Sequence, residues 1–155
     1  MMKIKRSKLK KYKRKLKVLE RAIELKPDDA AAWYIKGIIS GELEKYEEAL
    51  RAYEKTIELE PDYAEAWYNK GFTLGELEKY EEALQALEKA IELKPNYAEA
   101  WYNKSCIYSF KKSKRDALSH LSKAVVLNEE NTEKAKYDKD FEWIWDDPEF
   151  KKIVE

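Results

Sequence analysis

Few side chains in this sequence have the type and the spacing that catalysis or metal binding requires. His120 is the only histidine and Cys106 is the only cysteine of the chain. Neither has a partner at the spacing of zinc ligands or of a nucleophile and its general base, and the sequence holds no glycine-rich phosphate loop. We therefore predict no catalytic residue, no metal site and no cofactor, and we expect a protein that is not an enzyme.

Tyrosine and asparagine side chains suited to binding recur along the chain. Tyr68-Asn69 and Tyr102-Asn103 stand thirty-four residues apart, and Tyr34 stands one period upstream. An asparagine side chain offers both a donor and an acceptor, so a row of them can hold the backbone of an extended peptide beside rigid tyrosine rings. The same residues could instead support packing between helices, and both interpretations stay open.

The same period governs the elements that must position these side chains. Trp33, Trp67 and Trp101 each lie in an Ala-Trp-Tyr step. A fixed period of this length is typical of stacked units, because one unit cannot bury its apolar face until a neighbour covers it. Apolar residues recur within each unit at helical spacing, which predicts two antiparallel helices per unit. The predicted units are 30–63, 64–97 and 98–131.

Proline residues predict where the helices stop. Each of the three prolines between units is followed by a residue that can cap the next helix. The pairs are Pro27 with Asp28, Pro61 with Asp62, and Pro95 with Asn96. Glutamate stands three residues after Asp62 and after Asn96, which is the spacing of a capping box. We therefore expect these residues to start the first helix of their units.

Small residues predict where the two helices of a unit approach each other. Gly37 and Gly71 stand on first helices opposite alanines of the second helices. The second unit carries the set Trp67, Gly71, Ala83, Leu87, Ala90 and Pro95. This pattern resembles the tetratricopeptide repeat (TPR) family, whose signature places tryptophan, small residues, an aromatic or large residue and a closing proline at these intervals. The third unit departs from it at Ser105, Glu129 and the basic turn 111–115.

The resemblance implies an all-α fold, a right-handed α-solenoid of antiparallel helix pairs, in a single domain. Residues 12–27 match the second half of a further repeat, and Lys15 replaces the alanine that would face the missing first helix. We expect this helix to cap the array, to dock a second copy or another protein, or to be half of a truncated repeat. The predicted parts are a basic N-terminal half repeat (1–29), repeats at 30–63, 64–97 and 98–131, and a C-terminal cap (132–155).

In this family the first helices line the concave wall of the solenoid, so their inward positions are implied as the partner-binding groove. Those positions combine tyrosine and asparagine with apolar side chains, and we expect them to hold a peptide or protein segment. The predicted groove residues are Tyr34, Ile35, Ile38, Tyr68, Asn69, Phe72, Tyr102, Asn103 and Cys106.

Positive charge is concentrated at the N-terminus. Residues 1–17 hold ten lysines and arginines and no acid, although the whole chain has a formal net charge of zero. Such a segment could contact RNA, an anionic surface or the acidic groove of a second copy, or remain solvated. The predicted basic patch consists of Lys5, Arg6, Lys8, Lys10, Lys11, Lys13, Arg14, Lys15 and Lys17.

Taken together, these features predict a non-enzymatic scaffold that binds a protein or peptide partner in its groove. An RNA or anionic-surface adaptor and a homodimer formed through the N-terminal helix are the alternatives. We expect a cytoplasmic protein, because no apolar run approaches the ~18 residues of a membrane span and no secretory signal follows the basic N-terminus. The excess of Lys and Glu over Gln, Cys and Met suggests a thermophilic source.

Overall fold

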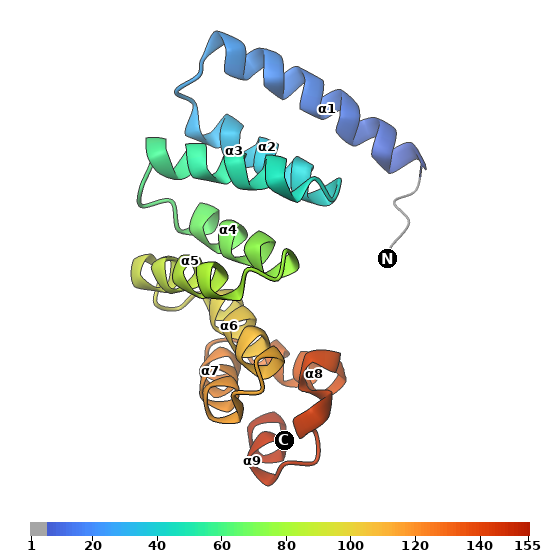
Figure 1. Cartoon of the computed structure of the whole chain (residues 1–155), viewed down its shortest axis with the longest axis vertical. Coiled ribbons are helices and arrows are strands. Elements are labelled where there is room, and N and C mark those ends of the chain that lie inside the picture. The colour runs from blue at the N-terminus through green and yellow to red at the C-terminus, as the bar shows by residue number, and fades with distance from the viewer. Residues whose placement is uncertain (1–5) are drawn as a thin grey trace.

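The computed structural model describes residues 6–155, and these residues form helices joined by short turns, with no strand among them. The helices follow one another along the long axis, so that α1 and α9 lie at opposite ends of an elongated stack (Figure 1). In chain order they are α1 (Arg6–Leu25), α2 (Ala30–Glu42), α3 (Tyr46–Leu59), α4 (Ala64–Glu76), α5 (Tyr80–Leu93), α6 (Ala98–Phe110), α7 (Lys114–Leu127), α8 (Glu130–Tyr137), the 3-10 helix η1 (Lys139–Ile144) and α9 (Pro148–Val154).

Three helix pairs make up the body of the stack, namely α2 with α3, α4 with α5, and α6 with α7. Each pair packs on the next one along the chain, so that α3 lies against α4 and α5 against α6. The predicted all-α solenoid of helix pairs is therefore confirmed.

The repeating tryptophans hold the turns between pairs. Each indole Nε1 donates a hydrogen bond to the main-chain carbonyl of the proline six residues earlier. The bonds join Trp33 to Pro27 at 2.9 Å, Trp67 to Pro61 at 2.9 Å and Trp101 to Pro95 at 3.0 Å. The period seen in the sequence is therefore the period of one structural contact.

The two helices of a pair touch at glycine in the first two repeats. A Cβ atom on Gly71 would lie 2.7 Å from the Cγ atom of Leu87, and one on Gly37 would lie 2.4 Å from the ring of Tyr53. Real Cβ atoms do not come so close, so no larger residue fits without movement. In the third repeat Ser105 takes this place, fully buried, and its hydroxyl donates to the carbonyl of Tyr102 at 2.6 Å.

The predicted caps are wrong, because each first helix begins one residue later than expected. Asp29, and not Asp28, caps α2 by accepting from the amide of Ala32 at 3.0 Å. Tyr63 and Tyr97 hold the equivalent positions of α4 and α6, where no side chain caps the helix. Neither Asp62 nor Asn96 caps its helix. The tyrosine rings pack instead against the preceding repeat, with ring centroids 4.8 Å apart for Tyr34–Tyr63 and for Tyr68–Tyr97.

The two ends close the stack differently. At the N-terminus, α1 lies on α2 and buries Leu16 and Ile23. At the C-terminus, α8, η1 and α9 cover α6 and α7 with a buried apolar cluster that includes Phe141, Ile144 and Phe150. Among residues 6–155, no helix combines the length and the hydrophobicity that a membrane crossing requires.

The glycine contact can be tested by comparing Gly71→Ala with Gly75→Ala. Both substitutions gain the helical preference of alanine, about 1 kcal/mol. A Cβ on Gly75 meets nothing closer than 4.0 Å, whereas one on Gly71 collides with Leu87 and with the Ala83 carbonyl at 3.1 Å. Overpacking of this kind costs about 1–3 kcal/mol. Urea unfolding should therefore find Gly71→Ala less stable than Gly75→Ala by about 1–3 kcal/mol. Equal stabilities would contradict the close approach of Gly71 and Leu87.

Candidate functional site

The predicted groove residues lie on α2, α4 and α6, and they differ in how far solvent reaches them. Ile35, Ile38 and Phe72 are exposed, at 44%, 38% and 46% of their surface. The residues that are partly buried are Tyr34, Tyr68, Asn69, Asn103 and Cys106. Tyr102 differs from all of these, because only 1% of its surface is exposed.

The asparagines and tyrosines form a hydrogen-bonded ladder between successive repeats. The amide nitrogen Nδ2 of Asn69 donates to the Tyr34 hydroxyl at 2.9 Å, and that of Asn103 donates to the Tyr68 hydroxyl at 3.2 Å. Desolvation by burial raises the pKa of both Tyr34 and Tyr68, so both hydroxyls stay protonated at neutral pH. Within residues 6–155 no hydrogen bond uses the Oδ1 atom of either asparagine. The ladder therefore joins repeats and still leaves two amide oxygens as acceptors for a ligand.

The C-terminal cap explains why Tyr102 is buried. The Tyr102 hydroxyl donates to Oδ2 of Asp138 at 2.7 Å, the ring of Phe141 stands edge-on 5.9 Å away, and the ammonium of Lys134 lies 3.8 Å from the centre of the tyrosine ring. Burial first, and then the bond to Asp138, raises the pKa of Tyr102 far above its usual range. The chain's own cap thus covers one of the three predicted groove residues of the third repeat, and Tyr102 is not available at the surface.

A cavity of about 380 Å³ lies where α4 and α6 meet this cap. Phe72, Asn103 and Cys106 of the predicted groove line it, together with acidic residues of α4 and of the cap. Cys106, Asp138 and Asp140 each bring one polar atom within 4.8 Å of the others. Burial, followed by the charge of Asp138, raises the pKa of the Cys106 thiol and also that of the Asp140 carboxyl.

No pattern in the sequence pointed to Asp138 and Asp140. They stand outside the repeat, so no period relates them to Cys106, and only the path of the cap back across α6 brings them together. The predicted absence of a metal site rested on cysteine and histidine spacing, which does not detect such a convergence of carboxylates. Lys134 lines the same cavity, and its positive charge offsets a small part of the rise in the pKa of both the thiol and Asp140.

His120 lies on the second helix of the third repeat and packs between two aromatic rings. Its ring centroid lies 5.5 Å from that of Trp101 and 4.9 Å from that of Tyr108, and its Nδ1 atom lies 2.8 Å from the main-chain carbonyl of Asp116. Burial lowers the pKa of the imidazole, while the carbonyl contact raises it less. We therefore interpret His120 as a half-buried residue whose role is packing.

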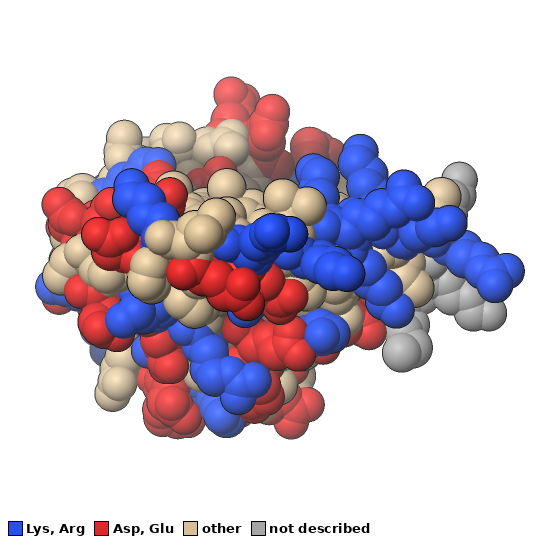
Figure 2. Space-filling view, turned by 90° about the horizontal axis from the view of Figure 1, so that it is seen from above, with Lys and Arg blue, Asp and Glu red and all other residues tan. Residues whose placement is uncertain are grey.

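The basic patch covers the N-terminal part of α1, and it forms a blue projection at one side of the molecule in Figure 2. Lys5 lies outside the described residues. The exposed members are Arg6, Lys8, Lys10, Lys11, Lys13, Arg14, Lys15 and Lys17. Lys8 pairs with Glu42 at 3.1 Å, and the hydroxyl of Tyr12 donates to the same carboxylate oxygen, so α1 is fastened to α2 at this point.

Comparison with protein families finds matches in three overlapping stretches. Two models described as "Tetratricopeptide repeat" match residues 64–97 and 86–139, and one described as "TPR repeat" matches residues 42–78. The matched region therefore runs from 42 to 139. No curated protein matches the chain.

Several solved structures share the fold. A crystal structure of MamA is 19% identical, covers 90% of this chain and 82% of its own, and has a TM-score of 0.78. MamA from Desulfovibrio magneticus RS-1 is 24% identical over 90% of this chain and 77% of its own, with a TM-score of 0.76. YrrB, described as a TPR protein with an unusual peptide-binding site, is 22% identical over 95% of this chain and 76% of its own, with a TM-score of 0.73.

The contact between Tyr102 and Asp138 can be tested with Tyr102→Phe. This change removes one hydroxyl that donates to a carboxylate, and such bonds contribute about 1.5–3 kcal/mol. We expect urea unfolding to show a loss of that size. Tyr137→Phe is the matched control, because the Tyr137 side chain is 78% exposed and should lose almost nothing. Equal stabilities of the two variants would show that the cap does not depend on this bond.

The lowered pKa of His120 can be measured directly, since the chain has no second histidine. We expect the NMR titration of its ring proton to give a pKa below the ordinary value of about 6.5, which the urea-unfolded chain should show. Because the unfolded state then takes up the proton first as the pH falls, the free energy of unfolding should be level above about pH 6.5 and decline below it. His120→Gln should reduce that decline. Identical folded and unfolded titrations would refute the packing described above.

Proposed function

The chain belongs to the tetratricopeptide repeat family, and from this premise we propose that it is a non-enzymatic scaffold that holds a peptide or protein segment in the groove of α2, α4 and α6. The observation that carries the proposal is the exposed apolar row of that groove. Ile35, Ile38 and Phe72 lie on successive first helices and keep more than a third of their surface in solvent. Contiguous exposed apolar surface of this kind is typical of interaction sites.

Polar groups beside the apolar row supply what a peptide backbone needs. The Oδ1 atoms of Asn69 and Asn103 can each accept a backbone N–H, and the ladder bonds to Tyr34 and Tyr68 hold both amides in place. Side chains that are fixed before binding lose less conformational entropy when the ligand arrives. The packing role and the binding role of the ladder are therefore compatible.

The similar fold of YrrB, described with a peptide-binding site, agrees with this proposal. The basic patch on α1 lies apart from the groove, and its proposed partners, RNA or an anionic surface, stay a separate prediction. The same holds for a homodimer formed through α1. Val18 on that helix is 70% exposed, and such a dimer would cover it.

The groove can be tested with peptides selected from a phage-displayed library of random dodecapeptides on the immobilised full chain. We expect Ile38→Ala combined with Phe72→Ala to weaken the selected peptides at least about tenfold, because truncation of central apolar contacts costs more than 1 kcal/mol each. Fluorescence polarisation of the labelled peptides gives the affinities, and circular dichroism should show unchanged helix content.

The matched control is Val18→Ala combined with Val126→Ala, which removes two exposed apolar side chains, 70% and 78% exposed, away from the groove. This variant should bind like the parent. Peptides that bind the groove variant as tightly as the parent would place the binding surface elsewhere and overturn the proposal.

A further inference from the structure

Four carboxylates and one lysine line the cavity between α4, α6 and the C-terminal cap, which we call the acidic pocket. Glu76 and Glu78 come from the end of α4 and the turn after it, while Asp138 and Asp140 come from the cap. The single positive charge is Lys134. The pocket therefore carries an excess of negative charge although the whole chain is neutral.

None of these four carboxylates forms an ion pair with a side chain of the described residues, although Lys134 lies in the same pocket. The ion pairs among residues 6–155 all involve other acidic residues, and none includes Glu76, Glu78, Asp138 or Asp140. Partial burial and the nearby Asp138 raise the pKa of Asp140, so a cation placed among these carboxylates would stabilise the charged form. Together with the excess of negative charge, this favours a positively charged ligand.

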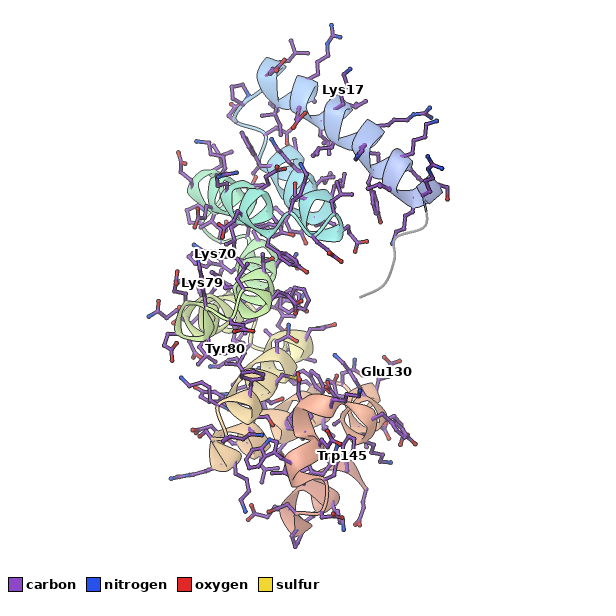
Figure 3. All side chains as sticks on the ribbon, turned by 45° about the vertical axis from the view of Figure 1, so that its right-hand side comes forward. Lys17, Lys70, Lys79, Tyr80, Glu130 and Trp145 are labelled. Carbon is purple, nitrogen blue, oxygen red and sulfur yellow. The ribbon has the colours of Figure 1, made fainter. Side chains whose placement is uncertain are left out.

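Aromatic rings form the walls beside the carboxylates. Phe72 and Phe110 are 46% and 57% exposed, and the rings of Tyr80 and Phe110 pack with centroids 5.0 Å apart. Figure 3 shows Tyr80 near the place where α5 meets α6. Exposed phenylalanines next to unpaired carboxylates suit a flat cation, because a guanidinium stacks on ring faces and bonds carboxylate oxygens in its plane.

We propose that the acidic pocket binds an arginine side chain of the peptide segment held in the groove, with the guanidinium between Glu76 and Asp140 and against Phe110. The inference rests on the proposed groove function and names the chemistry of its partner. Phe72 belongs both to the apolar row and to the pocket wall, so a peptide in the groove passes the mouth of the pocket.

Size and surroundings favour arginine over a metal ion. The cavity of about 380 Å³ far exceeds one ion, and Oδ2 of Asp138 already accepts the Tyr102 hydroxyl. A second hollow of about 480 Å³ shares Phe110 and Asp140 with the pocket and continues toward Trp143. The surface thus offers an extended chain a path on both sides of the anchored arginine.

The test uses the dodecapeptide library on the full chain, followed by resynthesis of one selected peptide with citrulline in place of its arginine. Citrulline keeps the shape and loses the charge. We expect arginine to be enriched at one position, and the citrulline peptide to bind at least about tenfold more weakly. Glu76→Gln combined with Asp140→Asn should weaken the arginine peptide similarly and abolish the preference over citrulline.

Asp62→Asn combined with Glu82→Gln is the matched control, because it removes two exposed acids outside the pocket and should leave binding unchanged.

Selected peptides that depend on Ile38 and Phe72 but lack arginine would overturn this inference and leave the groove function standing. If no peptide is selected, both fail. Tight Zn²⁺ binding lost in the pocket variant, with no arginine preference, would identify a metal site instead. Self-association of the parent that the pocket variant abolishes would identify α1 of a second copy as the occupant.

Discussion

The hydrogen bond from each repeat tryptophan to the proline carbonyl six residues earlier is the contact on which the stack depends. Each of these prolines lies in a turn, two residues after the end of a helix, so its carbonyl has no helical donor, and the indole N–H needs an acceptor once its ring is half-buried. One bond meets both needs. Because the same turn is made three times, the side chains one residue after each tryptophan come into line. This alignment lets Asn69 reach Tyr34 and Asn103 reach Tyr68, in each case across thirty-five positions of the sequence.

Charge pairs follow the same register and show how α1 takes part in it. Lys36 forms an ion pair with Glu20 at 3.7 Å, and Lys70 forms one with Glu54 at 3.1 Å. Lys104 pairs with Glu88 in the same way. In each case the lysine stands on a first helix and the glutamate stands on the helix before it. Helix α1 therefore occupies the place of a second helix in relation to α2. Exposed ion pairs of this kind contribute little stability. Lys104 differs because it is only 5% exposed, so removal of its partner Glu88 would leave a buried charge unpaired.

Sequence reasoning was sufficient wherever a contact repeats, and it failed where local and tertiary preferences compete. Helix pairs and the tryptophan period follow from spacing alone, whereas the glycines, which spacing put opposite alanines, meet the side chains of Tyr53 and Leu87 first. The caps did not follow from spacing, because Tyr63 and Tyr97 stand at the cap positions and pack their rings on the preceding repeat, while Asp62 and Asn96 lie one residue too early. Aspartate at position 29 has no ring to pack and caps its helix. A capping signal is local, and it cannot weigh a ring contact made across repeats.

The candidate site shows the same limit, and its cause lies in the third repeat. Ser105 takes the place of a glycine and Tyr102 is covered by Phe141, so the repeat gives its inner face to the chain's own cap and not to a ligand. In the earlier repeats the tyrosine hydroxyl accepts from an asparagine of the next repeat. At Tyr102 the cap places Asp138 there instead, so that acidic residues of the cap follow the last tyrosine of the row. If the proposed scaffold function holds, its specificity depends on residues that no repeat pattern relates to one another.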